Sequence, residues 1–527
     1  MTKGAVALVL HAHLPYVRSA QPGSLEEDWF FQALIECYLP LLETLELASA
    51  DPNQQPKLTI GLSPTLLSLL SDQDLKQRFP AWLNERLLLL PKADSALREG
   101  AEHLAATIER HQRAWQTCDG DLIQRFAALQ RQGVVDLLTC GATHGYLPLL
   151  RHHPEAVRGQ LRTAVREHQR LVGERPLGIW LPECAYYEGL DRWMRDAGLR
   201  YAVLDGHGLL HGRPRPRYGV YAPICSRNGV AFFGRDSDAT LPVWSAKDGY
   251  PGDPHYREFH RDLGWDLPIE ELKPLGLDQP RPLGLKLHRV TDHRAPLDRK
   301  RPYEPWVAAE RVKEHAADYL QGRRRQLDQL SRAMEVPPLL VAPFDAELFG
   351  HWWFEGPAFL SQLFQQAPQE GVAFTRLRDV LNSVGQLQLC DPCPSSWGQG
   401  GYHDYWLNDS NAWIIPEWER ASAAMVQRCS RGVGSEQAMQ WLQQAARELL
   451  LAQSSDWSFI LRAGTTTELA RERVQRHLGR FWQLMKAIDG TAELPEGWLE
   501  EVQMDDRLFP LIQPLDWAPA NPSGASA

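Results

Sequence analysis

The sequence contains seven short apolar segments. Six of them are followed by His, Glu or Asp, and one by Ser. Helical patterns separate most of them, and alternating strands and helices predict a parallel sheet. Parallel strands present their carboxyl ends at one edge, where barrel enzymes collect their catalytic groups. The sequence therefore predicts an α/β fold containing an incomplete (β/α)7 barrel. The predicted strands span residues 5–10, 57–62, 134–140, 177–181, 201–204, 282–287 and 338–345.

Three regions depart from the alternation of strands and helices. Residues 72–132 are rich in Leu, Ala and charge without strand-like alternation, which predicts a helical insertion. Residues 218–266 form a long segment with a hairpin-like 230–236; it is too aromatic for disorder and favours a lid over the site. Only helical patterns follow residue 400, at 417–430, 434–453 and 466–487. We therefore predict a catalytic barrel at 1–400 that holds both insertions, a C-terminal helical domain at 401–516 and a flexible tail at 517–527.

Composition narrows the class of partner. The net charge of -10 offers no electrostatic reason to bind nucleic acid or an anionic membrane, and a neutral ligand suits the chain better. The 19 tryptophans supply aromatic faces of the kind on which neutral sugars stack. No segment approaches the roughly 18 apolar residues of a membrane span, and no signal peptide precedes the first strand. Because the eight cysteines are scattered, we expect a cytoplasmic protein without a disulfide framework; the isolated Cys390 and Cys393 pair lacks further zinc ligands.

Two carboxylates stand at separate strand ends of the predicted edge. Glu183 follows the fourth strand and Asp345 ends the seventh. Cleavage of a glycosidic bond needs such a pair, because one carboxylate attacks the anomeric carbon or activates water while the other protonates the leaving oxygen. His11, His13 and His144 also follow strands, and we expect them to contact the hydroxyls of a sugar beside the carboxylates.

The histidines also permit a second chemistry. His11 and His13, with Asp345 or Asp205, are residue types that bind a divalent metal. Such a site would support hydrolysis or deacetylation by a metal-activated water. The sequence alone leaves this alternative open.

Motifs along nearly the whole chain resemble those of one enzyme family. They are HAHLPY at 11–16, GATH at 141–144, WLPECAY at 180–186, VWSAKDGYPGD at 243–253, YREF at 256–259, FDAELFGHW at 344–352, SWGQGGYH at 396–403 and SDW at 455–457. In content and order they resemble glycoside hydrolase family 57, and within it the enzymes that branch 1,4-α-glucans.

The resemblance implies a (β/α)7 barrel, an inserted helical domain and a C-terminal helical domain that closes part of a glucan groove. Glu183 would be the nucleophile that forms a β-glucosyl-enzyme, and Asp345 the general acid/base of a retaining reaction. Because Glu347 and His351 fall beyond the strand end, where the next helix begins, their position in the sequence predicts a supporting role. The expected partner is an α-glucan such as amylose or a glycogen-like polysaccharide, and no metal or organic cofactor is implied. The implied substrate-binding residues are His11, His13, His144, Arg257, Trp265, Trp397, Trp406 and Asp456.

One departure from the family concerns the loop at residues 230–250, to which we assign the role of the lid. Members that branch glucans generally carry a tyrosine there, whereas this chain has none between Tyr221 and Tyr250. The ratio of transfer to hydrolysis is therefore left open. The alternatives are an α-amylase or 4-α-glucanotransferase on the same scaffold, a metal-dependent polysaccharide deacetylase or mannosidase-like enzyme, and a non-catalytic glucan-binding protein.

Overall fold

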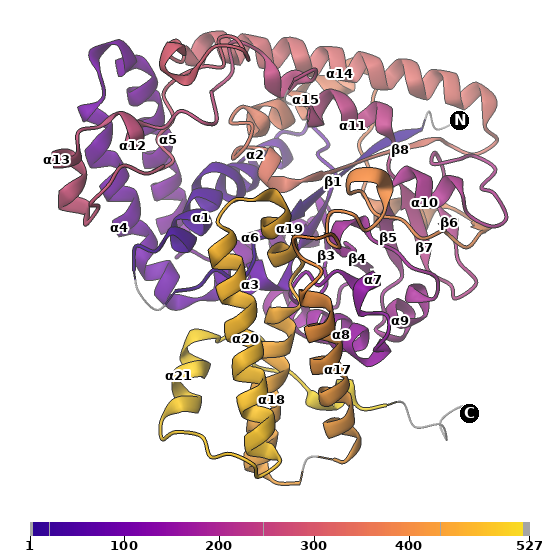
Figure 1. Ribbon diagram of the computed structural model, residues 1–527. Coiled ribbons are helices and arrows are strands. Elements are labelled where there is room, and N and C mark those ends of the chain that lie inside the picture. Colours follow the sequence, from indigo (N-terminus) through magenta and orange to yellow (C-terminus); the bar gives the residue numbers. More distant parts are fainter. Residues whose placement is uncertain (1–3, 20–21, 246, 433, 520–527) are drawn as a thin grey trace.

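The computed structural model describes residues 4–19, 22–245, 247–432 and 434–519, and short strands lie at the centre of the molecule with helices around them (Figure 1). The predicted α/β class is confirmed, and six of the seven predicted strands are present. The strands are β1 Ala5–Ala12, β2 Leu58–Leu62, β3 Val135–Leu138, β4 Gly178–Ile179, β5 Tyr201–Leu204, β6 Ile224–Cys225, β7 Ala231–Gly234, β8 Leu339–Asp345 and β9 Gln388–Leu389.

The strands form two sheets, with the orders β3-β2-β1-β8 and β4-β5-β7-β6-β9. All pairings in the first sheet are parallel, and in the second only β6 runs antiparallel to its neighbour β7. A parallel bridge between Thr139 and Ile179 connects the two sheets on one side. On the other side, the Asp236 amide donates to the Val341 carbonyl at 2.8 Å. Because His11 is paired with Asp345 in the register of β1 and β8, polar strand ends meet at one edge.

The predicted strand at 282–287 is wrong, and β7 takes the expected place of a sixth central strand. All four residues of β7 are buried and pair in parallel with β5, although they lie in the segment predicted as a lid. Leu283, Leu285 and Leu287 are buried, which explains their strand-like alternation. However, the Asp262 carboxylate accepts from the Leu283 and Gly284 amides, so a loop satisfies this backbone in place of a neighbouring strand.

Helices cover the sheets and make up the rest of the chain. The predicted helical insertion is helical in α4 to α6, and α14 crosses the top of the molecule in the view shown (Figure 1). Among the described residues, no helix is both long and apolar enough to span a membrane. The helices up to residue 400 are α1 Leu25–Ala33, α2 Leu39–Ala50, α3 Pro64–Ser71, α4 Gln73–Leu89, α5 Arg98–Thr117, α6 Leu122–Arg131, α7 Leu147–Leu150, α8 Pro154–Val172, α9 Leu190–Asp196, α10 Gly206–Leu210, α11 Ser237–Trp244, α12 Leu263–Asp266, α13 Ile269–Leu272, α14 Pro305–Ala333, α15 Gly356–Glu370 and α16 Leu377–Ser383.

Beyond residue 400, the described residues form helices and the loops that connect them, without a strand. Helices α17, α18 and α20 lie side by side below the sheets, whereas α19 lies near the ends of the central strands (Figure 1). The flexible tail does not begin at residue 517, because Trp517 is buried against Gly159 of α8; residues 520–527 lie outside the described residues. The helices are α17 Ile414–Ser430, α18 Glu436–Ala452, α19 Ser455–Ala463, α20 Thr467–Ile488 and α21 Trp498–Asp505.

Candidate active site

A cavity of about 640 Å³ opens at the carboxyl ends of the parallel strands. His11 comes from β1, Glu183 follows β4 and Asp345 ends β8. Helix α19 closes another side, because Asp456 and Phe459 also line the cavity. The predicted site residues in the cavity wall are His11, His13, His144, Glu183, Asp345, Trp397 and Asp456.

Glu183 lies in a strained turn directly after β4. Its φ is 61°, and that of Cys184 is also positive, in the short 3-10 helix that follows the strand. Non-glycine residues in this region cost about 1–3 kcal/mol and concentrate at functional sites. The turn brings the carboxylate to two donors: Trp397 Nε1 donates to Oε2 at 2.9 Å, and Ser455 Oγ donates to Oε1 at 3.2 Å.

Asp345 has different surroundings. No hydrogen bond to its carboxylate is found within the described residues, and burial raises its pKa well above the ordinary value. The Glu347 carboxylate adds to the rise and Arg235 opposes it. Burial also raises the pKa of Glu183 to about 7, where the bond from Trp397 opposes the rise and the charge of Asp345 adds to it.

These surroundings assign different protonation states to the two carboxyl groups. Hydrogen-bond donors stabilise an ionised carboxylate, and burial without donors favours the neutral acid. Glu183 is therefore the group prepared to ionise, and Asp345 the group prepared to keep its proton. A nucleophile and a proton donor in one cavity are what cleavage of a glycosidic bond requires.

A chain of hydrogen bonds leads from β1 to Glu183. His11 Nε2 and His144 Nε2 are 3.0 Å apart, and His144 Nδ1 is 2.8 Å from Ser455 Oγ. Burial, followed by the charge of neighbouring histidines, lowers the pKa of both imidazoles, so both are neutral. Since Ser455 donates to Glu183, His144 Nδ1 donates to Ser455 and His11 Nε2 donates to His144. This tautomer leaves His11 Nδ1 as a bare acceptor, consistent with its lack of a partner among the described residues.

His13 connects the strand end to the C-terminal region. Its Nε2 lies 3.1 Å from both carboxylate oxygens of Asp456, and its Nδ1 lies 2.8 Å from Ser63 Oγ. Burial alone would raise the pKa of Asp456, but the charge and hydrogen bond of His13 outweigh burial and lower it to about 2. An ionised Asp456 thus holds α19 against the strands.

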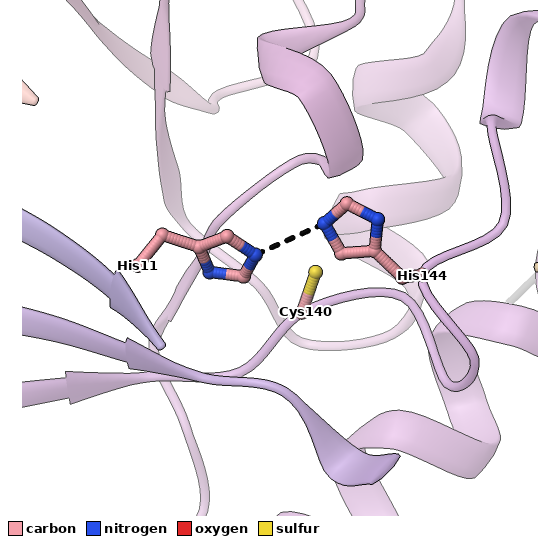
Figure 2. A group of neighbouring side chains, drawn as sticks. All are labelled: His11, Cys140 and His144. Atoms are coloured by element: carbon pink, nitrogen blue, oxygen red, sulfur yellow. Dashed lines mark hydrogen bonds between the residues drawn. The ribbon is translucent and has the colours of Figure 1, made fainter. Parts of the chain in front are cut away.

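Two groups of side chains near the carboxylates have the residue types of a metal site. The first is His11, Cys140 and His144, and Figure 2 shows the Cys140 sulfur near the two bonded imidazoles. Burial raises the pKa of this thiol well above its ordinary value, which disfavours the thiolate that binds metals. In the second group, the rings of His13 and His144 stack with centroids 3.9 Å apart and planes at 12°, so their in-plane lone pairs do not converge on one ion. The geometry of both groups fits a hydrogen-bonded stack better than a metal site. The predicted set of His11 and His13 with Asp345 or Asp205 is not among the groups of possible metal ligands found in the described residues.

Comparisons with known proteins agree with this geometry. Residues 7–391 match the profile of glycosyl hydrolase family 57, and residues 417–517 match the C-terminal region of 1,4-alpha-glucan branching enzymes. The chain belongs to glycoside hydrolase family 57. The curated 1,4-alpha-glucan branching enzyme of Thermococcus kodakarensis is 31% identical over 544 aligned positions, which cover 96% of this chain and 77% of that protein.

Two crystal structures of similar proteins have nearly the same fold as this family 57 chain. The novel alpha-amylase of Thermotoga maritima has a TM-score of 0.90 at 34% identity, covering 98% of this chain and 99% of that one. The GH57 branching enzyme of Thermococcus kodakaraensis, in complex with glucose and additives, has a TM-score of 0.90 at 31% identity, covering 99% of this chain and 97% of that one.

Three residues predicted to bind substrate lie outside the cavity wall of this family 57 protein. Arg257 is buried, donates to Glu36 at 2.8 Å and lies 3.7 Å above the Phe354 ring. Trp265 is 53% exposed on α12, away from the carboxylates. Trp406 is buried and packs beneath the loop at Gly398.

Other residues in or directly behind the cavity wall were not predicted to bind substrate. Ser455 contacts Glu183 and stands next to Asp456 in the SDW motif, which offered the one signal for it. Lys286 lies in the segment that was predicted as a strand. Glu347 lines the cavity and accepts from Tyr38 Oη at 2.6 Å and from the backbone amide of His13 at 3.1 Å.

Proposed function

We propose that this protein is a 1,4-α-glucan branching enzyme. It cleaves an α-1,4-glucan and transfers the released chain to a 6-hydroxyl, which forms an α-1,6 branch by a retaining double displacement. The observation that carries the proposal is a pair of carboxyl groups in a single cavity: Glu183 accepts from two hydrogen-bond donors, and none is found for Asp345 among the described residues. The match of residues 417–517 to the C-terminal region of branching enzymes supports it further.

In the first half of the reaction, Glu183 attacks the anomeric carbon and the α-1,4 bond breaks. Asp345 gives its proton to the leaving glycosidic oxygen, and a β-glucosyl-enzyme forms on Glu183. Trp397 and Ser455 hold the Glu183 carboxylate in place for the attack. These donors also stabilise the negative charge that returns to Glu183 when the ester is broken.

In the second half, Asp345 is ionised and accepts the proton of an incoming 6-hydroxyl. The oxygen of that hydroxyl attacks the anomeric carbon from the face that the leaving chain vacated, and the bond to Glu183 breaks. Two inversions restore the α configuration, now in an α-1,6 linkage. Asp345 ends the cycle protonated, and no cofactor enters either step.

The predicted substrate contacts divide into two kinds. His11, His13, His144, Trp397 and Asp456 line the cavity and are proposed to contact the glucosyl unit at the cleavage point. The predicted residues outside the wall have other proposed roles. Trp406 supports the Gly398 loop, and Arg257 fixes Glu36. The exposed Trp265 is proposed to contact a more distant part of the glucan chain.

A lid from residues 218–266 is proposed to exclude water from the glucosyl-enzyme. Phe232 and Phe233 belong to β7 and are buried, so they cannot serve as this lid. Trp244 is 36% exposed, and its ring lies 5.7 Å from that of Trp397. Trp244 is therefore the aromatic residue proposed to occupy the place of the missing tyrosine.

We infer that the two sheets together form the incomplete barrel of seven parallel strands. The proposed order is β1, β2, β3, β4, β5, β7 and β8. It is supported by the Thr139–Ile179 bridge and by the hydrogen bond from Asp236 to Val341. The proposal keeps the predicted division into a barrel with its insertions and a C-terminal helical domain. It also keeps the predicted cytoplasmic location.

Branch analysis tests the reaction. Amylose incubated with the enzyme and then treated with a debranching enzyme should release short linear chains, because new α-1,6 linkages have formed. Amylose carried through without the branching step is the control. If no α-1,6 linkage forms while the iodine colour of amylose falls, the branching proposal is wrong.

An α-amylase is the second candidate, and the similarity to the Thermotoga maritima enzyme favours it. The same mechanism gives hydrolysis when water replaces the incoming hydroxyl. The number of new reducing ends compared with new α-1,6 linkages separates the two activities. Reducing ends in large excess over branches would assign this chain to hydrolysis.

A further inference from the structure

A second cavity, of about 440 Å³, lies behind the loop that carries Trp397. Ser396 and Gly398, the two neighbours of Trp397 in the chain, line this second cavity, whereas Trp397 itself lines the catalytic one. Asp205 and His207, which follow β5, form another part of its wall. Its volume is within the range of about 300–1,000 Å³ typical of small-molecule sites.

Residues of the wall between the two cavities contact groups on both sides. Trp397 donates through its indole to Glu183 Oε2 at 2.9 Å, and its backbone amide donates to the Glu183 carbonyl at 3.0 Å. Arg235 forms an ion pair with Asp205 at 3.4 Å and opposes the rise in the pKa of Asp345. A molecule in the second cavity would therefore stand beside the loop that bonds Glu183 and beside Asp205, the ion-pair partner of Arg235.

The chemistry of the second cavity suits a neutral polyol. Asp205 accepts from His207 Nδ1 at 3.1 Å, and its carboxylate is the charged acceptor offered to hydroxyls. The Tyr402 side chain is 50% exposed beside them and offers a ring face to a sugar. The Asp205 carboxylate disfavours an anion, and His207 is already occupied at both ring nitrogens, since Nε2 donates to the Gly401 carbonyl at 2.9 Å.

The loop on this side is preformed. The Ser396 amide donates to the Gly401 carbonyl and the Gly401 amide to the Gly398 carbonyl, both at 2.8 Å. Gly398 has no room for a side chain, because an added Cβ would lie 2.5 Å from the Trp406 ring. The cavity therefore needs little reorganisation to bind a ligand.

We propose that the second cavity is a glucan-binding subsite, which takes the part of an α-glucan chain that extends beyond Trp397 from the reacting bond. The inference rests on the proposed action on α-glucans and adds a site for a second stretch of chain. The subsite increases affinity for long chains only, because short chains are held by the catalytic cavity alone.

Tyr402→Ala tests this subsite. The substitution leaves the loop intact, because the neighbouring Ser396 hydroxyl and Tyr146 bond the Tyr402 carbonyl and not its ring. The full-length Glu183→Gln protein serves as the inactive background, and calorimetry measures the dissociation constants of maltotriose and maltoheptaose. We expect Tyr402→Ala to weaken maltoheptaose binding by about five- to tenfold, from the loss of a stacking contact, and to leave maltotriose unchanged.

Two matched variants control the experiment. Tyr402→Phe keeps the ring and should retain maltoheptaose affinity to within about twofold. Trp306→Ala removes an aromatic ring that is 64% exposed on α14 and lines neither cavity, and should change neither constant.

The outcomes separate the subsite from the proposed function. Unchanged maltoheptaose affinity in Tyr402→Ala, or an equal loss for both oligosaccharides, would overturn the subsite, whatever reaction the enzyme catalyses. Conversely, branch analysis of the active enzyme decides the reaction without reference to Tyr402. A selective loss for maltoheptaose supports the subsite even if the reaction proves to be hydrolysis.

Discussion

The two carboxyl groups of the site follow β4 and β8, and their surroundings differ in the number of hydrogen-bond donors. At the end of β4, a strained turn presents Glu183 to the indole of Trp397 and the hydroxyl of Ser455. At the end of β8, Asp345 continues a regular strand and faces the cavity, where the Glu347 carboxylate adds to the rise in its pKa. The comparison teaches that hydrogen-bond donors are what distinguish the proposed nucleophile from the proposed proton donor.

The largest expected effect comes from removing the proposed nucleophile. Glu183→Gln should lower kcat by about 10⁴-fold or more, because no glucosyl-enzyme can form. The Kd for maltoheptaose should stay within about threefold of the wild type, since the cavity keeps its shape. Turnover and calorimetry measure the two effects, with the exposed Glu188→Gln as the control. Turnover near that of the wild type would mean that Glu183 is not the nucleophile.

Removing the proton donor should cost less. Asp345→Asn should lower kcat by about 10²- to 10⁴-fold on glucans, the range typical of general acid–base catalysis. Substrates with a good leaving group, such as an aryl α-maltoside, need little protonation, so they should form the glucosyl-enzyme nearly as fast as in the wild type. Azide should then restore turnover with retention of configuration. If azide restored turnover with inversion, the roles proposed for Glu183 and Asp345 would have to be exchanged.

Removing one donor from the β4 end sharpens the comparison. Ser455→Ala should lower kcat by about 10- to 100-fold, the equivalent of a hydrogen bond to a charged group. Because the lost donor stabilised the carboxylate, the pKa of Glu183 should rise and the acidic limb of the kcat/KM profile should move to higher pH. Ser458→Ala is the matched control, since Ser458 is also buried on α19 but its hydroxyl has no partner in the described structure. An unshifted acidic limb would assign Ser455 a packing role only.

The smallest effect concerns stability. The folded-state pKa of Glu183, about 7, lies above its ordinary value, so the folded protein holds a proton that the unfolded chain releases. This contribution stabilises the protein in acid and is lost as the pH rises through about 7. Glu183→Gln, which stays neutral, should therefore raise Tm by about 1–3 °C at pH 8 and by less at pH 5. Differential scanning calorimetry measures the shift, and a gap independent of pH would contradict it; Glu500→Gln on the surface is the control.

Local sequence patterns predicted most of the secondary structure and both carboxyl groups. Apolar runs that are buried on both faces must end where a polar residue meets the cavity, so Glu183 and Asp345 were visible as strand ends. The error at 282–287 arose because buried alternating leucines look alike in a strand and in a loop whose amides bond a carboxylate such as Asp262. The four residues of β7 do pair antiparallel with β6, and so short a pattern gave no sign that their other edge joins β5 in the central sheet.

The sequence by itself determined which residue types end the strands, because burial and periodicity are local properties. Tertiary structure alone decided how each carboxyl group is protonated. Ser455 reaches Glu183 from α19, far along the chain, and no local pattern encodes such a contact. Likewise Arg257 proved to be the partner of Glu36, and Trp406 the support of a glycine loop, because long-range packing and not residue type selects which side chains face the ligand.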